Sequence, residues 1–192
     1  MMKTIGSFLA GIALTLLVLW TGMSGLMFSE KESPFTVEET AARIQQNIQK
    51  AGNGWSISGL RNPAKPVEAE GGNVLPVLLI EACSTVYSAP ILKDDQVRIL
   101  SLLMPCKISV YKKSNGKVYI GILNAGLIGS FFGSMVGETM KKVVTDQEKF
   151  LVMDPSQPAP PLFIPKTGGS SGSSGGSGSG SGSGAAGADG GC

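Results

Sequence analysis

Residues 106–123 read CKISVYKKSNGKVYIGIL and contain the strongest short-range folding signal of the chain. Apolar and polar side chains alternate from Cys106 to Lys112 and again from Val118 to Leu123, which is typical of strands with one buried face. Between the two runs lies Asn115-Gly116, a dipeptide that favours the tight turn of a hairpin. The stretch therefore predicts two antiparallel strands, and with them a sheet.

Two segments upstream are expected to add strands to this sheet. Residues 74–83, VLPVLLIEAC, are almost all apolar, as in a strand that is buried on both faces. Residues 55–60, WSISGL, alternate apolar and small polar side chains. The proline- and glycine-containing residues 61–73 are expected to form a loop, and residues 84–92 a short helix or turn.

Two helices are predicted to accompany the strands. Thr36 and Glu39 form a capping box, and apolar residues at helical spacing follow it, so a helix is expected over residues 37–51. After Asn124 the period changes, which predicts a second helix that runs to about residue 152. The sequence thus predicts an α+β domain with a small antiparallel or mixed sheet and two main helices.

Residues 118–137 contain no charged side chain, and three glycines recur at four-residue spacing: Gly129, Gly133 and Gly137. Such a stripe lets helices pack very closely. A second membrane span over residues 118–137 is one alternative, and a helix that lies on the membrane or on a neighbouring subunit is another. The hairpin signal and Asn124 favour a strand followed by a helix.

The N-terminal segment predicts a membrane anchor. From Ile5 to Phe28 there is no charged side chain, and about 20 apolar residues suffice to cross a bilayer. An uncleaved single span is favoured over a signal peptide because the apolar run is long and its best cleavage site is poor. Lys3 precedes the span and mixed charge follows it, which favours a domain on the extracytoplasmic, periplasmic side of the cell membrane.

Small residues also recur along this predicted span, at Ser7, Gly11 and Thr15. Their four-residue spacing places them on one stripe, where another membrane helix could pack.

The chain is expected to divide into four parts. Residues 1–32 form the transmembrane anchor and residues 33–153 the α+β domain. Residues 154–166 are a proline-rich linker that runs extended out of the domain. Residues 167–192 form a Gly/Ser-rich, low-complexity tail that cannot bury enough apolar surface to become ordered.

Composition excludes several classes of function. The chain has no histidine, which removes Ser-His-Asp and Cys-His catalysis, His-ligated zinc and blue copper. A net charge of +2 without a basic, aromatic-rich stretch gives no indication of a nucleic-acid partner. No catalytic residue is indicated, so a non-enzymatic protein is favoured.

Three segments, in order, resemble the DUF302 family: SPFTVEET at residues 33–40, the buried strand at 75–83, and MPCKISVY at 104–111 before the hairpin. The resemblance covers about residues 33–152. It implies a compact α+β domain, often dimeric, with no established activity. Where the family usually has a glycine- or asparagine-rich turn, this chain has Ala82-Cys83-Ser84.

Cys83 ends one predicted strand and Cys106 begins another, and three interpretations stay open. In an oxidising compartment a disulfide is the simplest. Two buried thiols packed as small apolar groups are the second. A redox-active or metal-binding pair is the third, and with Met104 nearby the metal would be Cu(I), which prefers sulfur ligands. No other cofactor is indicated.

Glu81 lies inside the apolar strand at residues 74–83. A buried carboxyl group there could act as an acid or base. The plainer interpretation is an exposed position, or pairing with Lys107 or Arg98.

Three functions are consistent with these features. The favoured one is a membrane-anchored extracytoplasmic domain that serves as an accessory or assembly subunit of a larger membrane complex, with the bilayer and other subunits or a second copy as partners. The second is a thiol-redox or Cu(I)-handling protein that uses Cys83 and Cys106. The third is a small-molecule binding module with a pocket between helix 37–51 and the sheet.

Overall fold

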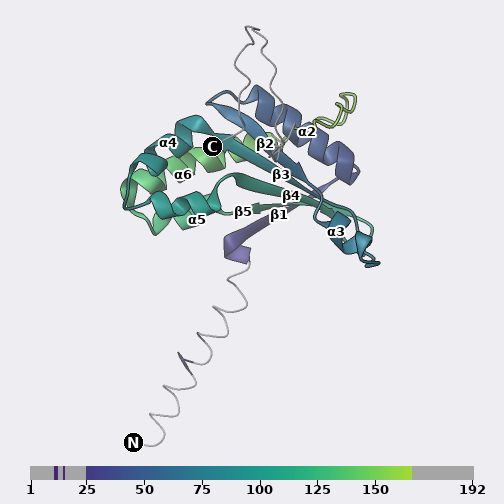
Figure 1. The fold of residues 1–192 in the computed structure, drawn as a ribbon, viewed down its shortest axis with the longest axis horizontal. Helices are drawn as coiled ribbons and strands as arrows, with labels where there is room; N and C mark the ends of the chain where they lie inside the picture. Colours follow the sequence, from purple (N-terminus) through teal and green to yellow (C-terminus); the bar gives the residue numbers. More distant parts are fainter. Residues whose placement is uncertain (1–10, 13–14, 16–24, 166–192) are drawn as a thin grey trace, which may run out of the picture.

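The computed structural model describes residues 11–12, 15 and 25–165 of the chain. A five-stranded sheet in the order β1-β5-β4-β3-β2 forms its centre, and all neighbouring strands are antiparallel (Figure 1). The strands are β1 (Phe28–Ser33), β2 (Trp55–Arg61), β3 (Val77–Ser84), β4 (Cys106–Lys112) and β5 (Val118–Leu123). The predicted α+β class is confirmed, and the sheet is antiparallel rather than mixed.

The predicted hairpin is confirmed in its bounds and its turn. β4 and β5 pair from Ile108↔Ile122 to Lys112↔Val118. Gly116 in the turn has a φ of 82°, a left-handed backbone conformation that glycine adopts without steric cost.

β1 was not predicted as a strand, because most of its residues were expected to form the end of the anchor. It lies at the edge of the sheet against β5, where Lys113 contacts Glu30 at 2.6 Å and Lys117 contacts Glu32 at 2.9 Å. Most of its residues are exposed, so it shows none of the alternation that identifies a half-buried strand. The boundary at residue 32 is therefore wrong, because the sheet begins at Phe28.

Helix α2 (Val37–Lys50) covers one face of the sheet and forms the main core with it. As predicted, the Thr36 hydroxyl accepts a hydrogen bond from the Glu39 backbone N–H at 3.2 Å. The apolar stripe of α2 packs against the inward side chains of β2, β3 and β4. The fully buried members include Ile44, Ile48, Ile80, Ile108 and Val110. These side chains are closely packed, and a pocket between this helix and the sheet stays a prediction.

The second predicted helix is divided in two, α5 (Ala125–Ser130) and α6 (Gly133–Phe150). Gly133 has a φ of 84°, which permits the sharp turn between them. A Cβ added at Gly129 would lie 2.6 Å from the Met140 Cβ and 3.3 Å from the Gly137 Cα. The glycine stripe therefore does permit very close packing, but it packs α5 on α6 of the same chain.

The remaining helices are short. Helix α4 (Thr85–Lys93) confirms the expected short helix after β3, and the 3-10 helix η1 (Arg98–Leu103) follows it. Helix α3 (Ala64–Ala69) occupies part of the expected loop over residues 61–73. Its proline, Pro66, lies in the first turn, where proline is tolerated.

Among the helices of the described residues, none is both long enough and apolar enough to cross a membrane. Most of the expected anchor, including Ser7, and the expected tail lie outside those residues. Of the small-residue stripe, Thr15 donates a hydrogen bond to the Gly11 carbonyl oxygen at 2.9 Å. Residues 118–137, the alternative second span, form β5, α5 and the turn into α6.

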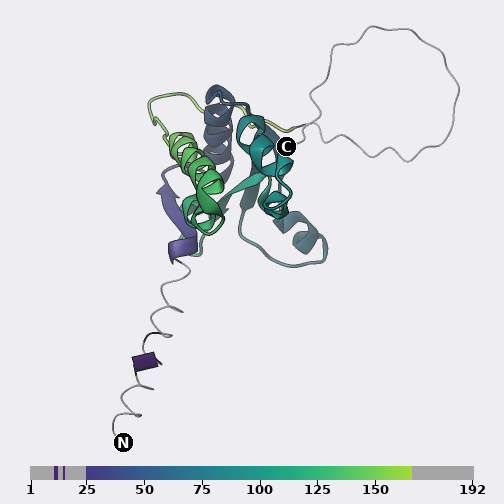
Figure 2. The same cartoon turned by 90° about the vertical axis from the view of Figure 1, so that its left-hand side faces the viewer.

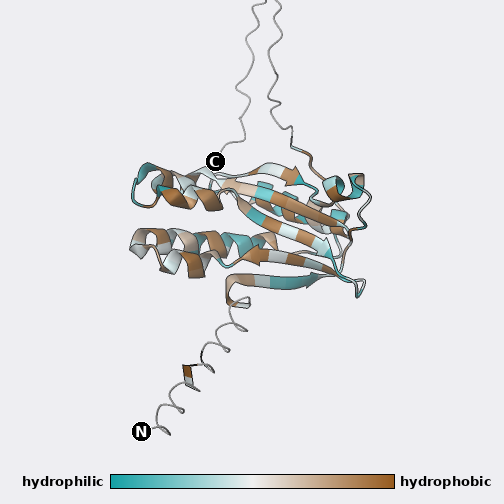
Figure 3. Ribbon diagram, turned by 60° about the horizontal axis from the view of Figure 1, so that its bottom comes forward, coloured by the Kyte–Doolittle hydropathy of each residue, from teal (hydrophilic) through white to brown (hydrophobic). Residues whose placement is uncertain are grey.

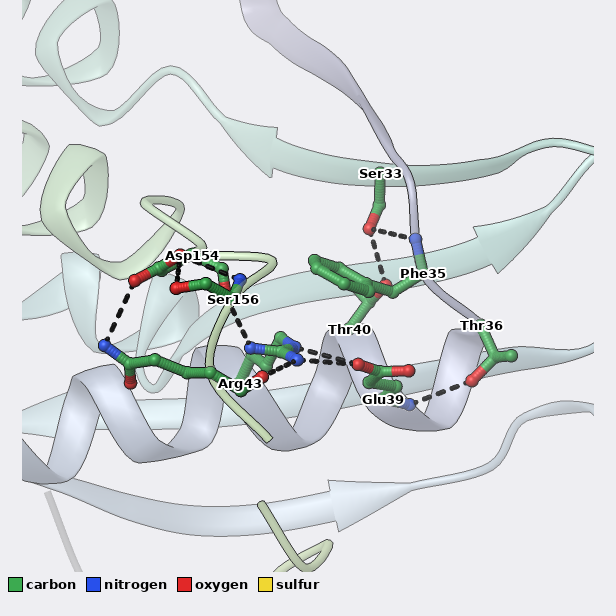
Figure 4. Close-up of polar contacts among 9 residues, drawn as sticks. Ser33, Phe35, Thr36, Glu39, Thr40, Arg43, Asp154 and Ser156 are labelled. Atoms are coloured by element: carbon green, nitrogen blue, oxygen red, sulfur yellow. Dashed lines mark hydrogen bonds and ion pairs between the residues drawn. The ribbon is translucent and has the colours of Figure 1, made fainter. Parts of the chain in front are cut away.

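The proline-rich segment after α6 is extended, as predicted, but it lies along α2 instead of leaving the domain (Figure 4). The Arg43 guanidinium donates to the backbone carbonyls of Asp154 at 2.9 Å and Gln157 at 2.7 Å. The Gln45 side chain bonds both backbone groups of Phe163, at 2.8 and 2.9 Å. These contacts depend on polar side chains of α2, which periodicity does not identify as contact residues.

Candidate functional site

Two helical arms extend from one end of the sheet (Figures 1 and 2). The α4–η1 arm comprises residues 85–103, and the α5–α6 arm begins at residue 125 and includes the N-terminal half of α6. Both arms leave the same end of the sheet because the strands are antiparallel. The end of β3, the start of β4 and the end of β5 lie side by side, and the arms follow β3 and β5 there. A cavity of about 270 Å³ lies between the arms and the end of the sheet.

The cavity is lined mainly by apolar side chains. They come from both arms and from the strand ends, and they include Trp55, Ile91, Leu100, Leu102, Leu103, Met104, Ile128, Val136, Met140 and Val143. Small-molecule sites in proteins are usually apolar cavities with a few polar groups that orient the ligand, and their volumes begin near 300 Å³. The space between the arms therefore suits a small, mainly apolar ligand.

The lining of the cavity also includes Gln147, whose side-chain oxygen has no hydrogen-bond partner among the described residues. The residue is 3% exposed and lies on α6, and it lines the cavity. Its side-chain carbonyl oxygen Oε1 is buried and accepts no hydrogen bond from the described residues. A buried acceptor left unpaired costs about 1–3 kcal/mol. A ligand that donates a hydrogen bond to Oε1 would remove this cost.

The neighbouring Asp146 is, in contrast, fully bonded. It is 2% exposed, and its Oδ2 accepts hydrogen bonds from Trp55 Nε1 at 3.0 Å, Tyr87 OH at 2.9 Å and Asn53 Nδ2 at 3.1 Å. Lys149 contacts Oδ1 at 2.8 Å. Burial raises the pKa of Asp146, but these bonds outweigh it and hold the pKa well below its usual range. Asp146 therefore ties α6 to β2 and α4 and positions Gln147.

The predicted sulfur residues Cys83, Met104 and Cys106 all line the cavity. In the register Cys106 pairs with Ala82 and not with Cys83. Cys106 is a free cysteine, and the expected disulfide between the two is not formed. Burial raises the pKa of the Cys106 thiol, which keeps it neutral near pH 7. Among the described residues no three His, Cys, Asp or Glu side chains form a metal-binding group, and a Cu(I) site stays a prediction.

Glu81 lies away from the cavity. It is buried, and its Oε1 accepts a hydrogen bond from Arg61 Nε at 2.9 Å across the β2–β3 pair. Lys107 is its neighbour in the register with β4. The expected pairing with a basic residue is therefore correct in kind, but the bonded partner is Arg61, on the neighbouring strand.

Both arms expose large apolar side chains, on η1 of the first arm and around the α5–α6 turn of the second. Leu102 on η1 and Phe131 between α5 and α6 are each 76% exposed. We call these exposed apolar residues of the two arms the tip residues; they are Ile99, Leu102, Leu103, Phe131, Phe132 and Met135. Figure 3 shows hydrophobic segments in both arms, together with hydrophilic ones. Exposed apolar clusters of this kind usually mark a contact surface.

Sequence reasoning missed both Gln147 and the tip residues. Gln147 lies in the polar stretch TDQEK, where nothing distinguishes a buried amide from an exposed one. The charge-free run over residues 118–137 was a usable signal for the tip of the α5–α6 arm. No comparable signal marks η1, because a short apolar run is equally typical of a buried segment.

Comparison with known proteins gives a consistent result for the fold. A family model described as "Domain of unknown function DUF302" matches residues 29–153, from β1 to the end of α6. A crystal structure of an uncharacterized conserved DUF302 protein from Bacillus stearothermophilus is similar, with 18% sequence identity and a TM-score of 0.57 over 65% of this chain and 95% of that chain. No curated protein matches. At this identity the likeness supports the fold alone.

Proposed function

Because the chain belongs to the DUF302 family, whose domain has no known function, we propose a function from the cavity itself: the protein is a membrane-anchored, non-enzymatic domain that binds a small apolar ligand between the α4–η1 and α5–α6 arms. The buried Oε1 of Gln147, which has no partner among the described residues, in a mainly apolar cavity carries this proposal. The anchor and the extracytoplasmic location come from the sequence.

The polar groups around the cavity define the chemistry of the ligand. The Ser84 hydroxyl donates to the Asn53 carbonyl oxygen at 2.6 Å and accepts from the Tyr87 backbone N–H. The Tyr87 hydroxyl is bonded to Asp146. These groups already have partners, whereas Gln147 Oε1 is a buried side-chain acceptor without one among the described residues, so it is the acceptor that we assign to the ligand. The ligand class is therefore an apolar body with one hydroxyl or N–H donor.

The same groups support binding rather than catalysis. A thiol acts as a nucleophile only when it is ionised, and burial raises the pKa of Cys106. The pKa of Tyr87 is also raised, by burial and by its bond to Asp146. Neither group is an activated acid, base or nucleophile near pH 7.

The role as an accessory or assembly subunit of a membrane complex stays a prediction. The glycine stripe, one of the observations that favoured it, now supports it less. Gly129 and Gly137 are used for packing within the chain, so they do not offer a stripe to a second protein. The thiol or Cu(I) role is also weaker, because the Cys106 thiol is neutral near pH 7.

The proposal is tested with the full chain in lipid nanodiscs and 1-aminoanthracene, a fluorescent apolar probe with an N–H donor. We expect saturable binding at one site per chain. Gln147→Leu should weaken it at least tenfold, because the acceptor is lost while the volume is kept. Ile128→Trp, which fills part of the cavity, should also abolish binding.

The matched control is Gln49→Leu, the same change at an exposed position on α2. Its affinity should equal that of the wild type. Equal affinities for the Gln147→Leu and Gln49→Leu variants, or the lack of saturable binding to the wild type, would refute the proposal.

A further inference from the structure

We infer that the tip residues of both arms contact the surface of the lipid bilayer that holds the N-terminal anchor. The inference rests on the anchor in the proposed function. It joins η1, which the sequence did not identify, to the charge-free residues 118–137 in one contact surface. Two tip residues, Leu102 and Leu103, also line the cavity. The contact would therefore place the ligand site next to the membrane.

The first argument is the chemistry of the two tips. Residues 99–106 and 118–137 contain no charged side chain, and the tip residues within them are exposed. The basic residue next to η1, Arg98, is paired with Asp95 at 2.6 Å. The tips therefore offer apolar side chains to the boundary between headgroups and acyl chains, where such side chains are stabilised.

The second argument is the connection between the anchor and the α5–α6 arm. The Asn124 backbone N–H donates to the Met27 carbonyl oxygen at 2.8 Å, and its side-chain Nδ2 donates to the Leu26 carbonyl oxygen at 3.0 Å. Leu26 and Met27 end the apolar segment that begins at Ile5. The same Asn124 caps α5 by accepting the Leu127 N–H at 3.1 Å. The arm thus begins where the anchor ends.

The length of the arm keeps its tip close to that point. Helix α5 has six residues, which span about 9 Å at 1.5 Å per residue. Phe131 follows directly as its C-cap. A bilayer surface at residues 26–28 therefore lies close to the end of α5, and the α4–η1 arm leaves the same end of the sheet (Figures 1 and 3).

The third argument is the charge at the opposite end of the sheet. The β4–β5 turn there carries the ion pairs Lys113–Glu30 and Lys117–Glu32. The tip residues themselves are uncharged, although the α4–η1 connection beside Ile99 carries Lys93, Asp94, Asp95 and Arg98. The apolar tip residues, and not the charged turn, are therefore the surface that we place against the membrane. A protein partner would not require the apolar surface to lie beside the end of the anchor.

The experiment uses the full chain in nanodiscs whose lipids carry a nitroxide near the top of the acyl chains. We expect the methyl NMR signals of Leu102, Leu103 and Ile99 to be broadened at least threefold more than those of Val67 and Leu75. These two controls are exposed apolar residues on and after α3, at the end of the sheet away from the arms (Figure 1).

A pair of matched variants sharpens the test. Leu102→Ser combined with Phe131→Ser should reduce the broadening at Leu103 by more than half, and Val67→Ser should leave it unchanged. Broadening at the tips no greater than at Val67 and Leu75 would overturn the inference, and so would cross-linking of the tips to another protein without lipid broadening. If 1-aminoanthracene still binds in that case, the proposed function stands and only the membrane contact fails.

Discussion

The α2-covered half of the sheet and the two arms are built from similar apolar residues, but they use them differently. Ile44, Ile48, Ile80 and Ile108 between α2 and the sheet are completely buried. The arms share only a small buried cluster, Ile91, Leu100 and Val136, and leave a cavity and exposed tips. The difference indicates that the first region stabilises the fold, while the second is less closely packed and leaves space for a ligand.

Polar and steric contacts replace apolar packing in holding the arms. Asp146 joins α6 to β2 and α4, and Gly129 lets α5 lie directly on α6. These contacts fix the walls of the cavity without filling it. The comparison therefore predicts that core changes cost most, arm contacts less, and cavity changes least.

The largest effect is expected at Phe150 in the core, with Phe131 at an exposed position as its matched control. Phe150 is 1% exposed and packs edge-to-face on Trp55, with ring centroids 5.1 Å apart. Phe150→Ala should lower the free energy of unfolding by about 3–5 kcal/mol. Phe131→Ala, at an exposed tip, should change it by at most about 0.5 kcal/mol. Urea unfolding of the full chain in detergent, followed by circular dichroism, measures both, and similar losses would break the comparison.

Asp146→Asn should cost about 2–3 kcal/mol of unfolding free energy, because bonds to a charged acceptor are stronger than those to a neutral one. Its effect should depend on pH. Since the pKa of Asp146 is lowered in the folded state, its contribution is complete above the unfolded pKa of about 4. It is lost as the pH falls toward the folded value.

The measurement is unfolding free energy against pH in the wild type and the variant. The curves should differ most above pH 5 and converge at lower pH. Asp95→Asn, at an exposed position, should leave the curve close to that of the wild type. A constant difference from pH 7 down to pH 2 would contradict the assigned role of the Asp146 carboxylate.

Gly129→Ala should destabilise the protein by about 1–3 kcal/mol, because the new methyl group would overlap with Met140. Gly126→Ala on the same helix is the control. A Cβ there would meet its nearest neighbours at 3.5 Å, an ordinary contact, and alanine favours the helix. Thermal unfolding should separate the two variants. If both were neutral, close packing would not hold the α5–α6 arm.

The smallest effect is expected at the cavity. Without ligand, Gln147→Leu should raise the free energy of unfolding by about 1 kcal/mol, since it removes an unpaired buried acceptor. The same variant should bind 1-aminoanthracene more weakly. A loss of stability instead would mean that Oε1 has a partner in the folded protein, and the cavity would lose its polar recognition group.

Much of the fold was predictable because its signals are local. Alternation in residues 106–123 predicted β4 and β5, and the capping box with its apolar stripe predicted α2. β1 was missed because an exposed edge strand has no apolar period. The division of the second helix was missed because a glycine stripe does not show which glycine permits close packing and which permits a turn. Gly129 lies at the close contact between α5 and α6, and Gly133 forms the turn between them.

The sequence by itself determined the α+β class, the hairpin, α2, the family resemblance and the lack of histidine chemistry, since period, capping and composition act between near neighbours. Only the tertiary structure decided which cysteine is free, where the cavity lies, and that Gln147 faces it without a partner. Those properties arise where β3, β4, β5 and α6 meet. Burial at such a meeting point depends on residues far apart in the chain, so no local pattern records it.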